Sequence, residues 1–561
     1  MPVLTQLQSL YDRSLGLAGP HLGLKITGAL IGSLLLYIAY SVYRHRKWPA
    51  YTIPGPPFKG LLYGSAPSPM YDFAALYLHE GWFRKYGPTV RAWLSLLRPA
   101  IMTVDPVALK HMLTSTAYEK GEQQKQFLGD VLGEGLLFVE GAEHKKQRRV
   151  MSPAFGPLQV KRFTETFVRK SLEMRDVWLD ICARNTTRED GYAKIDAFAW
   201  LNKVTLDIIG LAGFDYDIDS LHAPDDHPNE LNEAVRTIFS FDFGLGALMQ
   251  FLIPGLRRIP TKRAREQAKA QALITSIGMR LIQSKKQAII RETFLSPNDV
   301  EKKDIQGSDL LSLLLKANMA SDLPESSRMS DKDIVSQVPT FLIAGHETTS
   351  TAVTWGLYAM ACDIRVQQKL RSELLTVNTE TPTEAELNSL PYLDAIVREI
   401  LRVYAPVYMT ERNAIRDDVV PLKTPILGTD GVMRSEILVS KGDMIRFPIQ
   451  VINRMEEYWG EDAHQFRPER WSKLPDTVKE LPGVFSNMLT FFAGTHACIG
   501  YRFSIAEMKA IIFTIVRSFE FELPIAPMDV MRKTMIVGRP SLTTDPTAGN
   551  QLPLLIRPIN T

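Results

Sequence analysis

The sequence predicts a mainly α-helical protein with small β-sheets, preceded by one membrane-spanning helix. Helical periodicity dominates from residue 160 to residue 362, whereas strand-like runs are short and occur near 89–103 and 437–448. An uncharged apolar stretch lies near the N-terminus. From residue 61 to residue 561 no serine- or glycine-rich linker and no solenoid-type repeat interrupts the chain, so we expect a single body there.

Composition supports a large core and excludes several classes of protein. The chain has 561 residues, of which 45% are hydrophobic and 23% are charged. Its 65 basic and 62 acidic residues give a net charge of +3, which excludes nucleic-acid binding driven by bulk charge. The three cysteines, Cys182, Cys362 and Cys498, lie far apart, which excludes a disulfide scaffold and a Cys-x-x-Cys zinc module.

The first element is an expected membrane anchor over residues 22–43. The chain carries no charge from Ile26 to Val42, and this length suits a helix that crosses a bilayer. Tyrosines stand at positions 37, 40 and 43, and the basic run 44–47 follows, which predicts a body on the cytosolic side. A cleaved signal peptide and a buried core helix are the alternatives. The expected division is an N-terminal segment 1–21, the anchor 22–43, a basic and proline-rich extended hinge 44–60, and a globular body 61–561.

The longest predicted helix runs from Ser330 to Asp363. Ser330 is a suitable N-cap, and the mostly apolar sequence predicts a central rod. Its middle reads Ala-Gly-His-Glu-Thr-Thr over residues 344–349, which is a poor sequence for a buried helix centre. Residues that are unfavourable at a buried helix centre indicate a functional site, and a solvent-facing stripe is the alternative.

Near the C-terminus, Cys498 lies in a loop that suits a thiolate ligand. Gly494 and Gly500 permit a close approach of the backbone, and Phe491 is positioned to shield the sulfur. A helix is expected after Gly500, and its positive end favours the thiolate. One thiolate does not hold zinc or an iron–sulfur cluster alone, but it serves as the axial ligand of a heme. We expect Cys182 and Cys362 to be buried structural residues.

The sequence around Cys498 resembles the heme-binding loop of the cytochrome P-450 family, Phe-x-x-Gly-x-Arg-x-Cys-x-Gly. Phe491, Gly494, Cys498 and Gly500 match it, and His496 stands where the family has arginine. The family's Glu-x-x-Arg, Pro-Glu-Arg-Phe and oxygen-activating motifs are matched, in the family's order, by Glu399 to Arg402, by Pro468 to Trp471 and by Ala344 to Thr349.

The resemblance implies a cytochrome P-450 fold with a long central helix over heme b, and it implies a role for each matched residue. Cys498 would bind the iron, Thr348 would steady dioxygen by its hydroxyl, Glu347 would relay protons through water, and Gly345 would leave room for dioxygen. Glu399, Arg402 and Arg470 would form a buried structural network. The residues implied to hold the heme propionates are His496, Arg148, His144 and Arg412.

The resemblance also implies an electron donor and a place in the cell. Only 561 − 498 = 63 residues follow Cys498, too few for a flavin or ferredoxin domain. Electrons from NADPH would therefore come from a separate NADPH–cytochrome P-450 reductase, with cytochrome b5 as a second candidate donor. Lys145, Lys146 and Arg149 are candidates for the docking surface. Like microsomal members, the chain would be a single-pass protein of the endoplasmic reticulum membrane.

The implied activity is insertion of one oxygen atom from O2 into a hydrophobic small molecule. The motif wording resembles fungal members that act on terpenoids, steroids or other secondary metabolites. A heme-thiolate isomerase or dehydratase acting on a peroxide, a non-catalytic heme sensor and a membrane-tethered scaffold without cofactor are the alternatives. By analogy with the family's layout, the segments expected to line the substrate pocket are Phe127–Phe138, Phe239–Phe251, Thr340–Ile343, Val407–Thr410 and Met535–Val537.

Overall fold

The computed structural model describes residues 48–561 except 62, 67–72, 185–190, 225–229, 240–260, 296–308, 321–322, 535 and 560–561, together with a few positions between 28 and 43. The predicted anchor falls mostly outside the described residues and stays a prediction, and so does most of the predicted lining segment 239–251. Among the described residues, one helix is long enough and apolar enough to cross a membrane, namely α8 (Ala197–Phe214). However, 72% of α8 is buried inside the protein.

Helices make up most of the described chain, as predicted. The other helices that matter for the site are α3 (Phe73–Tyr86), α4 (Pro106–Thr114), α5 (Glu122–Leu132), α6 (Gly141–Met151), α7 (Pro157–Arg184), α9 (Glu230–Phe239), α11 (Lys262–Leu295), α12 (Leu310–Met319), α13 (Asp331–Val335), α14 (Gln337–Cys362), α15 (Ile364–Leu374), α16 (Glu384–Asn388), α17 (Pro391–Val403), α18 (Ile449–Ile452), α19 (Glu456–Trp459) and α20 (Tyr501–Ser518).

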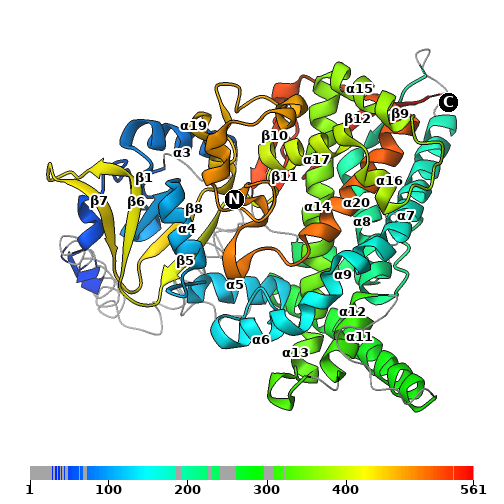
Figure 1. Ribbon diagram of the computed structural model, residues 1–561, viewed down its shortest axis with the longest axis horizontal. Coiled ribbons are helices and arrows are strands. Elements are labelled where there is room, and N and C mark those ends of the chain that lie inside the picture. The colour runs from blue at the N-terminus through cyan, green and yellow to red at the C-terminus, as the bar shows by residue number, and fades with distance from the viewer. Residues whose placement is uncertain are drawn as a thin grey trace, which may run out of the picture.

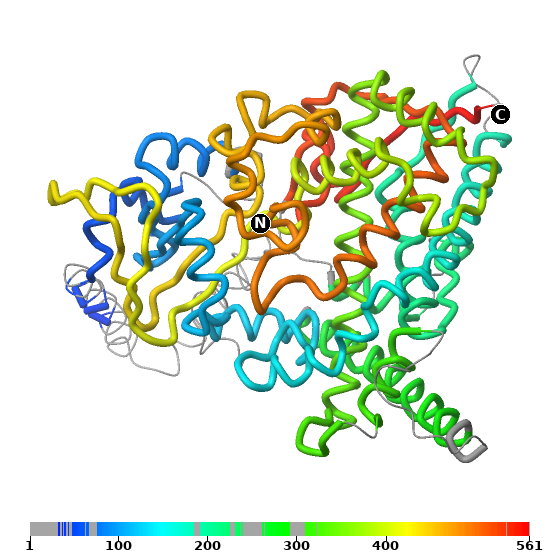
Figure 2. The backbone as a smooth tube through the Cα atoms, viewed as in Figure 1, coloured from blue at the N-terminus to red at the C-terminus, as the bar shows by residue number. Residues whose placement is uncertain are grey.

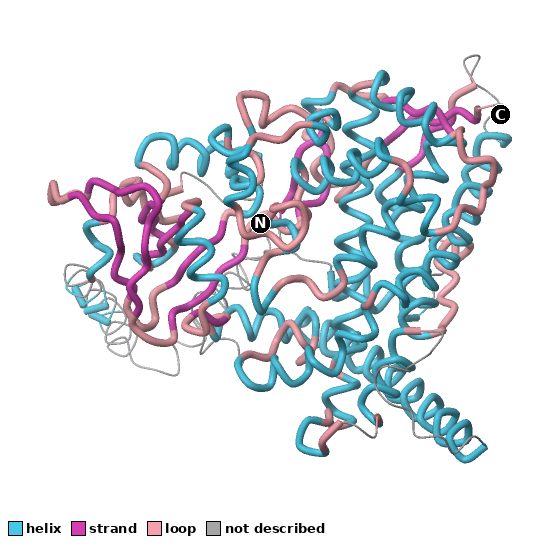
Figure 3. The backbone as a smooth tube through the Cα atoms, in the orientation of Figure 1, coloured by secondary structure: helices cyan, strands magenta, loops and turns pink. Residues whose placement is uncertain are grey.

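The strands form small sheets. The five-stranded sheet and the β6–β7 pair lie on one side of the molecule, at the left of Figures 1 and 3, whereas β10 and β11 lie near the middle and β9 and β12 lie among the helices. One sheet has the order β1-β2-β8-β5-β3, in which β2 and β8 are parallel and the other pairs are antiparallel. The remaining sheets pair β6 with β7, β10 with β11, and β12 with both β4 and β9. The strand bounds are β1 (Thr89–Trp93), β2 (Pro99–Thr103), β3 (Tyr118–Glu119), β4 (Ala193–Asp196), β5 (Thr410–Ala414), β6 (Asp418–Leu427), β7 (Met433–Val439), β8 (Met444–Phe447), β9 (Phe519–Glu522), β10 (Val530–Thr534), β11 (Gly538–Leu542) and β12 (Pro553–Pro558).

The sheet side and the helical side are joined by polar contacts at α4. Asp105 caps α4 by accepting hydrogen bonds from the backbone of Val107 and Ala108. The same carboxylate also accepts hydrogen bonds from the backbone N–H groups of Lys423 and Thr424 in β6. The segment that precedes α20 lies between the two sides (Figure 2).

The predicted rod from Ser330 to Asp363 is broken into two helices. Ser330 caps α13 with a reciprocal capping box to Asp333, as expected of an N-cap, but α13 ends at Val335 and α14 begins at Gln337. Pro339 explains the break, because it has no N–H group to bond the carbonyl one turn earlier.

The predicted hinge 44–60 needs a correction, because part of it belongs to the body. Pro49–Thr52 forms a short 3-10 helix, and Trp48, Ala50 and Ile53 are buried in the main core. The indole N–H of Trp48 donates to Asp443 at 2.7 Å. Apolar side chains at 48, 50 and 53 therefore hold this stretch against the globular body, so it is part of the body and not a separate extended hinge.

The central helix α14 packs against α8 through a glycine. A Cβ added to Gly345 would lie 2.9 Å from the buried Ile209 side chain of α8. The missing side chain is therefore needed for close helix packing, and the expectation that Gly345 leaves room for dioxygen stays a prediction.

We expect Gly345→Ala to be less stable than a matched Gly81→Ala variant. Gly81 is an exposed residue of α3 with nothing within 4 Å of an added Cβ, so alanine there gains only helix propensity, about 1 kcal/mol. At Gly345 the same gain is opposed by overpacking of about 1–3 kcal/mol. Denaturant unfolding of both variants measures the difference, and equal stabilisation would contradict the packing role of Gly345.

Candidate active site

The loop before α20 positions Cys498 by backbone contacts. Cys498 donates its N–H to the Phe491 carbonyl at 2.8 Å. Gly494 has φ +64°, and a Cβ there would overlap the carbonyl oxygen of Leu113 at the end of α4, so this position requires glycine. A Cβ at Gly500 would meet only Phe155 at 3.6 Å, so the expected close backbone approach occurs at Gly494 and not at Gly500.

Cys498 lies deep in the protein and is nevertheless accessible. Burial raises the pKa of its thiol. The residue nevertheless has exposed surface, although Phe491, Phe492 and Ala497 around it are buried. A side chain of this kind faces an internal space instead of packed hydrocarbon. The N–H of Gly500 and the charge of Arg148 lower the pKa in part. The predicted preference for thiolate from the helix end is therefore outweighed by burial in the chain alone.

The other two cysteines differ from expectation. Cys182 is only partly buried, and Cys362 is exposed because it is the last residue of α14, where the helix ends at the surface. Among the residues that the structure describes, no three His, Cys, Asp or Glu side chains gather as metal ligands. A metal bound by Cys498 must therefore bring its other ligands with it, as a porphyrin does.

Basic and polar side chains gather beside this loop. His496 lies 2.7 Å from Glu140, and its ring stacks on that of His144 with 4.5 Å between ring centroids. Glu140 also accepts a hydrogen bond from Lys120. Although burial opposes it, the hydrogen bond from His496 and the charge of Lys120 lower the pKa of Glu140 to about 2. Arg412 of β5 belongs to the same cluster, since the charge of Glu140 acts on it.

The cluster fits the two carboxylates of a heme. Burial, and then the charge of His496, lower the pKa of His144 to about 4, and burial lowers the pKa of Arg412 to about 10. Desolvated donors of this kind bind anions strongly. Arg148 lies one turn after His144 on α6 and is close enough to Cys498 for the two charges to interact. All four predicted propionate residues thus lie near the loop. Lys120 and Glu140 belong to the same cluster, but no sequence motif predicts them.

The middle of α14 contains Ala344 and Thr348. Both are only partly buried, and they lie one turn apart on the helix. The Thr348 hydroxyl donates to the Ala344 carbonyl at 2.8 Å, which leaves its oxygen free to accept a hydrogen bond.

Glu347 points elsewhere. Its carboxylate is buried and lies 2.5 Å from the Arg539 Nε of β11 and 3.8 Å from the His346 Nε2. Sequence reasoning missed Arg539, because it stands 192 residues away and belongs to no motif. An ion-paired carboxylate is an acceptor and not a donor.

The three residues of the predicted structural network lie in contact and are buried. Glu399 of α17 accepts two hydrogen bonds from Arg402, at 2.9 and 2.8 Å, and one from Arg470 Nε at 2.9 Å. The indole N–H of Trp471 donates to the same carboxylate at 3.0 Å, a contact that a phenylalanine at this position cannot make. Arg402 also donates to the Asn453 carbonyl at 3.0 Å.

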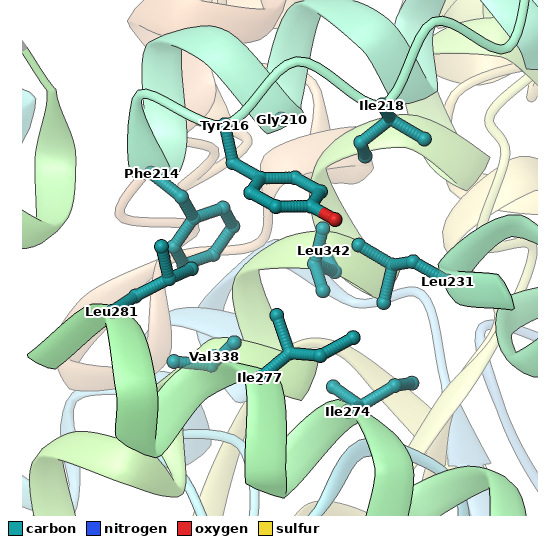
Figure 4. A pocket seen from close by; sticks show the side chains of 10 residues that line it. All are labelled: Gly210, Phe214, Tyr216, Ile218, Leu231, Ile274, Ile277, Leu281, Val338 and Leu342. Atoms are coloured by element: carbon teal, nitrogen blue, oxygen red, sulfur yellow. The ribbon is translucent and has the colours of Figure 1, made fainter. Parts of the chain in front are cut away.

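Two hollows lie near α14, and they differ in size. A pocket of about 10 Å³ between α8, α9, α11 and α14 holds about one water and is almost wholly apolar, with the Tyr216 ring among its lining side chains (Figure 4). It is a packing gap. A cleft of about 630 Å³ lies between α5, α11 and the start of α14, within the range of small-molecule sites. Phe138, Met279 and Pro339 supply its apolar lining, and Asp130, Glu134 and Lys332 supply charge.

Comparison with known proteins places these features in one family. The profile of the cytochrome P-450 family matches residues 54–545. The chain is 49% identical over 520 residues to cytochrome P-450 monooxygenase 205 of Postia placenta, covering 91% of this chain and 94% of that protein. It is 43% identical to cytochrome P-450 monooxygenase 128 of the same fungus, covering 94% and 96%. Cytochrome P-450 monooxygenase claW of Ampulloclitocybe clavipes is 31% identical, covering 94% and 98%.

We expect Glu399→Gln to destabilise the protein strongly. The neutral amide leaves Arg402 as a buried charge without its counter-ion, while Arg470 keeps only its ion pair with Asp462. Loss of the partner of a buried charge costs about 3–5 kcal/mol. Thermal or denaturant unfolding measures the loss. Asp476→Asn is the control, because its ion pair with Lys479 is exposed and its removal should change little. A Glu399→Gln variant as stable as Asp476→Asn would show that the network does not hold this region.

Proposed function

The chain belongs to the cytochrome P-450 family and is a monooxygenase of that family, with a heme-thiolate cofactor and a redox partner, and from this premise we propose that it oxygenates a hydrophobic small molecule of the terpenoid, steroid or related secondary-metabolite class. The observation that carries the proposal is the accessible sulfur of Cys498 inside the protein, beside a cluster of desolvated anion-binding side chains. The relatives named as monooxygenases favour this activity over a peroxide isomerase or a heme sensor.

The residues around the cofactor would divide their work by position. Cys498 would bind the iron from one side, and His144, Arg148, Arg412 and His496 would hold the propionates. A thiolate-bound heme supplies the oxygen chemistry, because sulfur donates electron density that favours O–O cleavage. The Thr348 hydroxyl, one turn after the partly buried Ala344 on α14, would accept and pass protons.

An apolar substrate is supported by the segments around the site. Phe341, Leu342 and Ile343 of α14 are buried apolar residues, and Phe138 and Pro339 line the larger cleft. The cleft offers a route of suitable size from the surface to α14. Its charged residues, such as Asp130 and Lys332, suit the mouth of such a route more than an apolar binding chamber.

We further propose an NADPH–cytochrome P-450 reductase as the electron donor and the endoplasmic reticulum membrane as the location. Lys145 and Arg149 lie on the exposed face of α6, opposite the buried His144. Since α6 also carries Arg148 beside the sulfur, this basic face is a short route to the cofactor for an acidic flavoprotein. The anchor predicted over 22–43 supports the membrane location.

We expect Cys498→Ser to abolish the thiolate spectrum. Reduced protein treated with carbon monoxide should show the Soret band typical of thiolate ligation in the wild type and lose it in the variant. Cys362→Ser is the matched control, since that cysteine is exposed at the end of α14 and should leave the spectrum unchanged. A thiolate spectrum in Cys498→Ser would refute the assignment.

We expect Thr348→Ala to bind heme normally and to release hydrogen peroxide in place of product. The alanine removes the hydroxyl that moves protons beside the middle of α14. Product and peroxide per NADPH are measured with a purified reductase and a panel of sesquiterpenes, triterpenes and sterols. Thr354→Val is the control, because the Thr354 hydroxyl donates to the Ser350 carbonyl within the helix. Unchanged coupling in Thr348→Ala would exclude this role.

A further inference from the structure

His496 stands where the cytochrome P-450 family has arginine, and both nitrogens of its ring already have hydrogen-bond partners. Its Nε2 lies 2.7 Å from a carboxylate oxygen of Glu140, and its Nδ1 lies 3.1 Å from the Thr495 hydroxyl. Because a carboxylate only accepts hydrogen bonds, Nε2 carries a proton and donates it to Glu140. Nδ1 faces a hydroxyl group, which can accept or donate. His496 therefore has no N–H left for a heme propionate, whereas an arginine has five.

Glu140 is turned toward this histidine and away from its own helix. It is the N-cap residue of α6, yet its side chain accepts no hydrogen bond from the start of that helix. One carboxylate oxygen accepts from His496, and the other accepts from both the ammonium group and the backbone N–H of Lys120. The side chains of Lys120 and Glu140 are each only 6% exposed. The carboxylate thus fixes two donors at once, one on each oxygen.

Lys120 lies beside Arg412, the strand residue implied to hold a propionate. β3 pairs antiparallel with β5, so that Glu119 lies opposite Asn413. The next step in this register brings Lys120 opposite Arg412, and residues directly opposite one another share a face of the sheet. Both residues are buried. Burial, and then the charge of Arg412, lower the pKa of Lys120, which agrees with two cations lying side by side.

This pair of cations has room for a second anion. Like charges that lie directly opposite one another destabilise a strand pair unless negative charge balances them. Glu140 supplies one negative charge, since it binds Lys120 and its charge also acts on Arg412. Glu411, whose charge acts on Arg412 as well, is paired with Arg446. The Lys120 ammonium has three N–H groups, and among the described residues its side chain donates only to Glu140. The excess positive charge and the remaining N–H groups suit another carboxylate.

We propose that Lys120 donates a hydrogen bond to the heme propionate that Arg412 would bind, in place of the arginine that the family has at position 496. Glu140 and His496 are positioning residues, because Glu140 holds the ammonium group and His496 holds Glu140. His496 thus takes part in propionate binding through Lys120 and not by a hydrogen bond of its own. The proposal rests on the heme of the proposed function and does not depend on the substrate.

The hydrogen bond is tested by resonance Raman spectroscopy on the full-length heme-loaded protein. The propionate bending band reports hydrogen bonds to the heme carboxylates and needs neither substrate nor turnover. We expect Lys120→Met to shift this band and Lys120→Arg, which keeps a charged donor, to restore it in part. Lys170→Met is the matched control, because Lys170 is also buried and donates to a glutamate, Glu173, at 2.7 Å on α7. Its band should equal that of the wild type.

Heme retention gives a second measurement. Transfer of heme to excess apomyoglobin should be about tenfold faster in Lys120→Met, as expected for the loss of one charge-assisted hydrogen bond. The double variant Lys120→Met, His496→Arg should regain the wild-type rate and band, because a guanidinium at position 496 has donors for both Glu140 and a propionate. A double variant that loses heme as fast as Lys120→Met would contradict the exchange of roles between the two positions.

Two further outcomes would overturn the proposal. One is an unshifted band in Lys120→Met, and the other is equally fast heme loss in Lys120→Met and Lys170→Met, which indicates general damage to the fold. Either result in a protein that keeps its thiolate spectrum would leave the proposed function intact. A wild type that binds no heme would contradict the proposed function and this proposal together.

Discussion

The buried carboxylate of Glu399 is the constraint on which the position of the cysteine loop depends. It holds Arg402, and Arg402 donates to the carbonyl of Asn453. The Asn453 side chain in turn donates to the Thr490 hydroxyl at 2.8 Å, just before the segment that leads to Cys498. Because a buried charge tolerates no loss of its partner, this chain of contacts allows little movement. The sulfur is therefore positioned by ion pairs that lie away from it and make no contact with it.

The parts of the site that sequence could predict are those carried by short spacings with a fixed meaning. Glu399 and Arg402 share a helix face because they stand three residues apart, and the family resemblance supplied Arg470 as their partner. The contact of Gly345 with α8 was not predictable, because it depends on the rotation of α14 about its axis. Arg539 was missed for a related reason: it lies on a strand far along the chain from its partner Glu347.

The fold shows the same division between local and distant causes. Helical periodicity predicted the mainly α-helical body and the strand-like runs correctly, but it ran through Pro339 and merged two helices into one. Prolines near the N-terminus suggested a stiff, extended spacer, while the buried Trp48 and Ile53 beside them attach that segment to the core. Apolar residues within a polar, proline-rich stretch are the sequence signal that indicates this attachment to the core.

The glycine at position 494 has a mechanical consequence for the whole molecule. Its backbone lies directly against Leu113 at one end of α4, and the opposite end of α4 is capped by Asp105, which also binds the backbone of β6. One short rigid helix thus connects the strand-rich side to the sulfur without a flexible joint. A shift of the strand-rich side would therefore also displace the backbone at Gly494, four residues before Cys498.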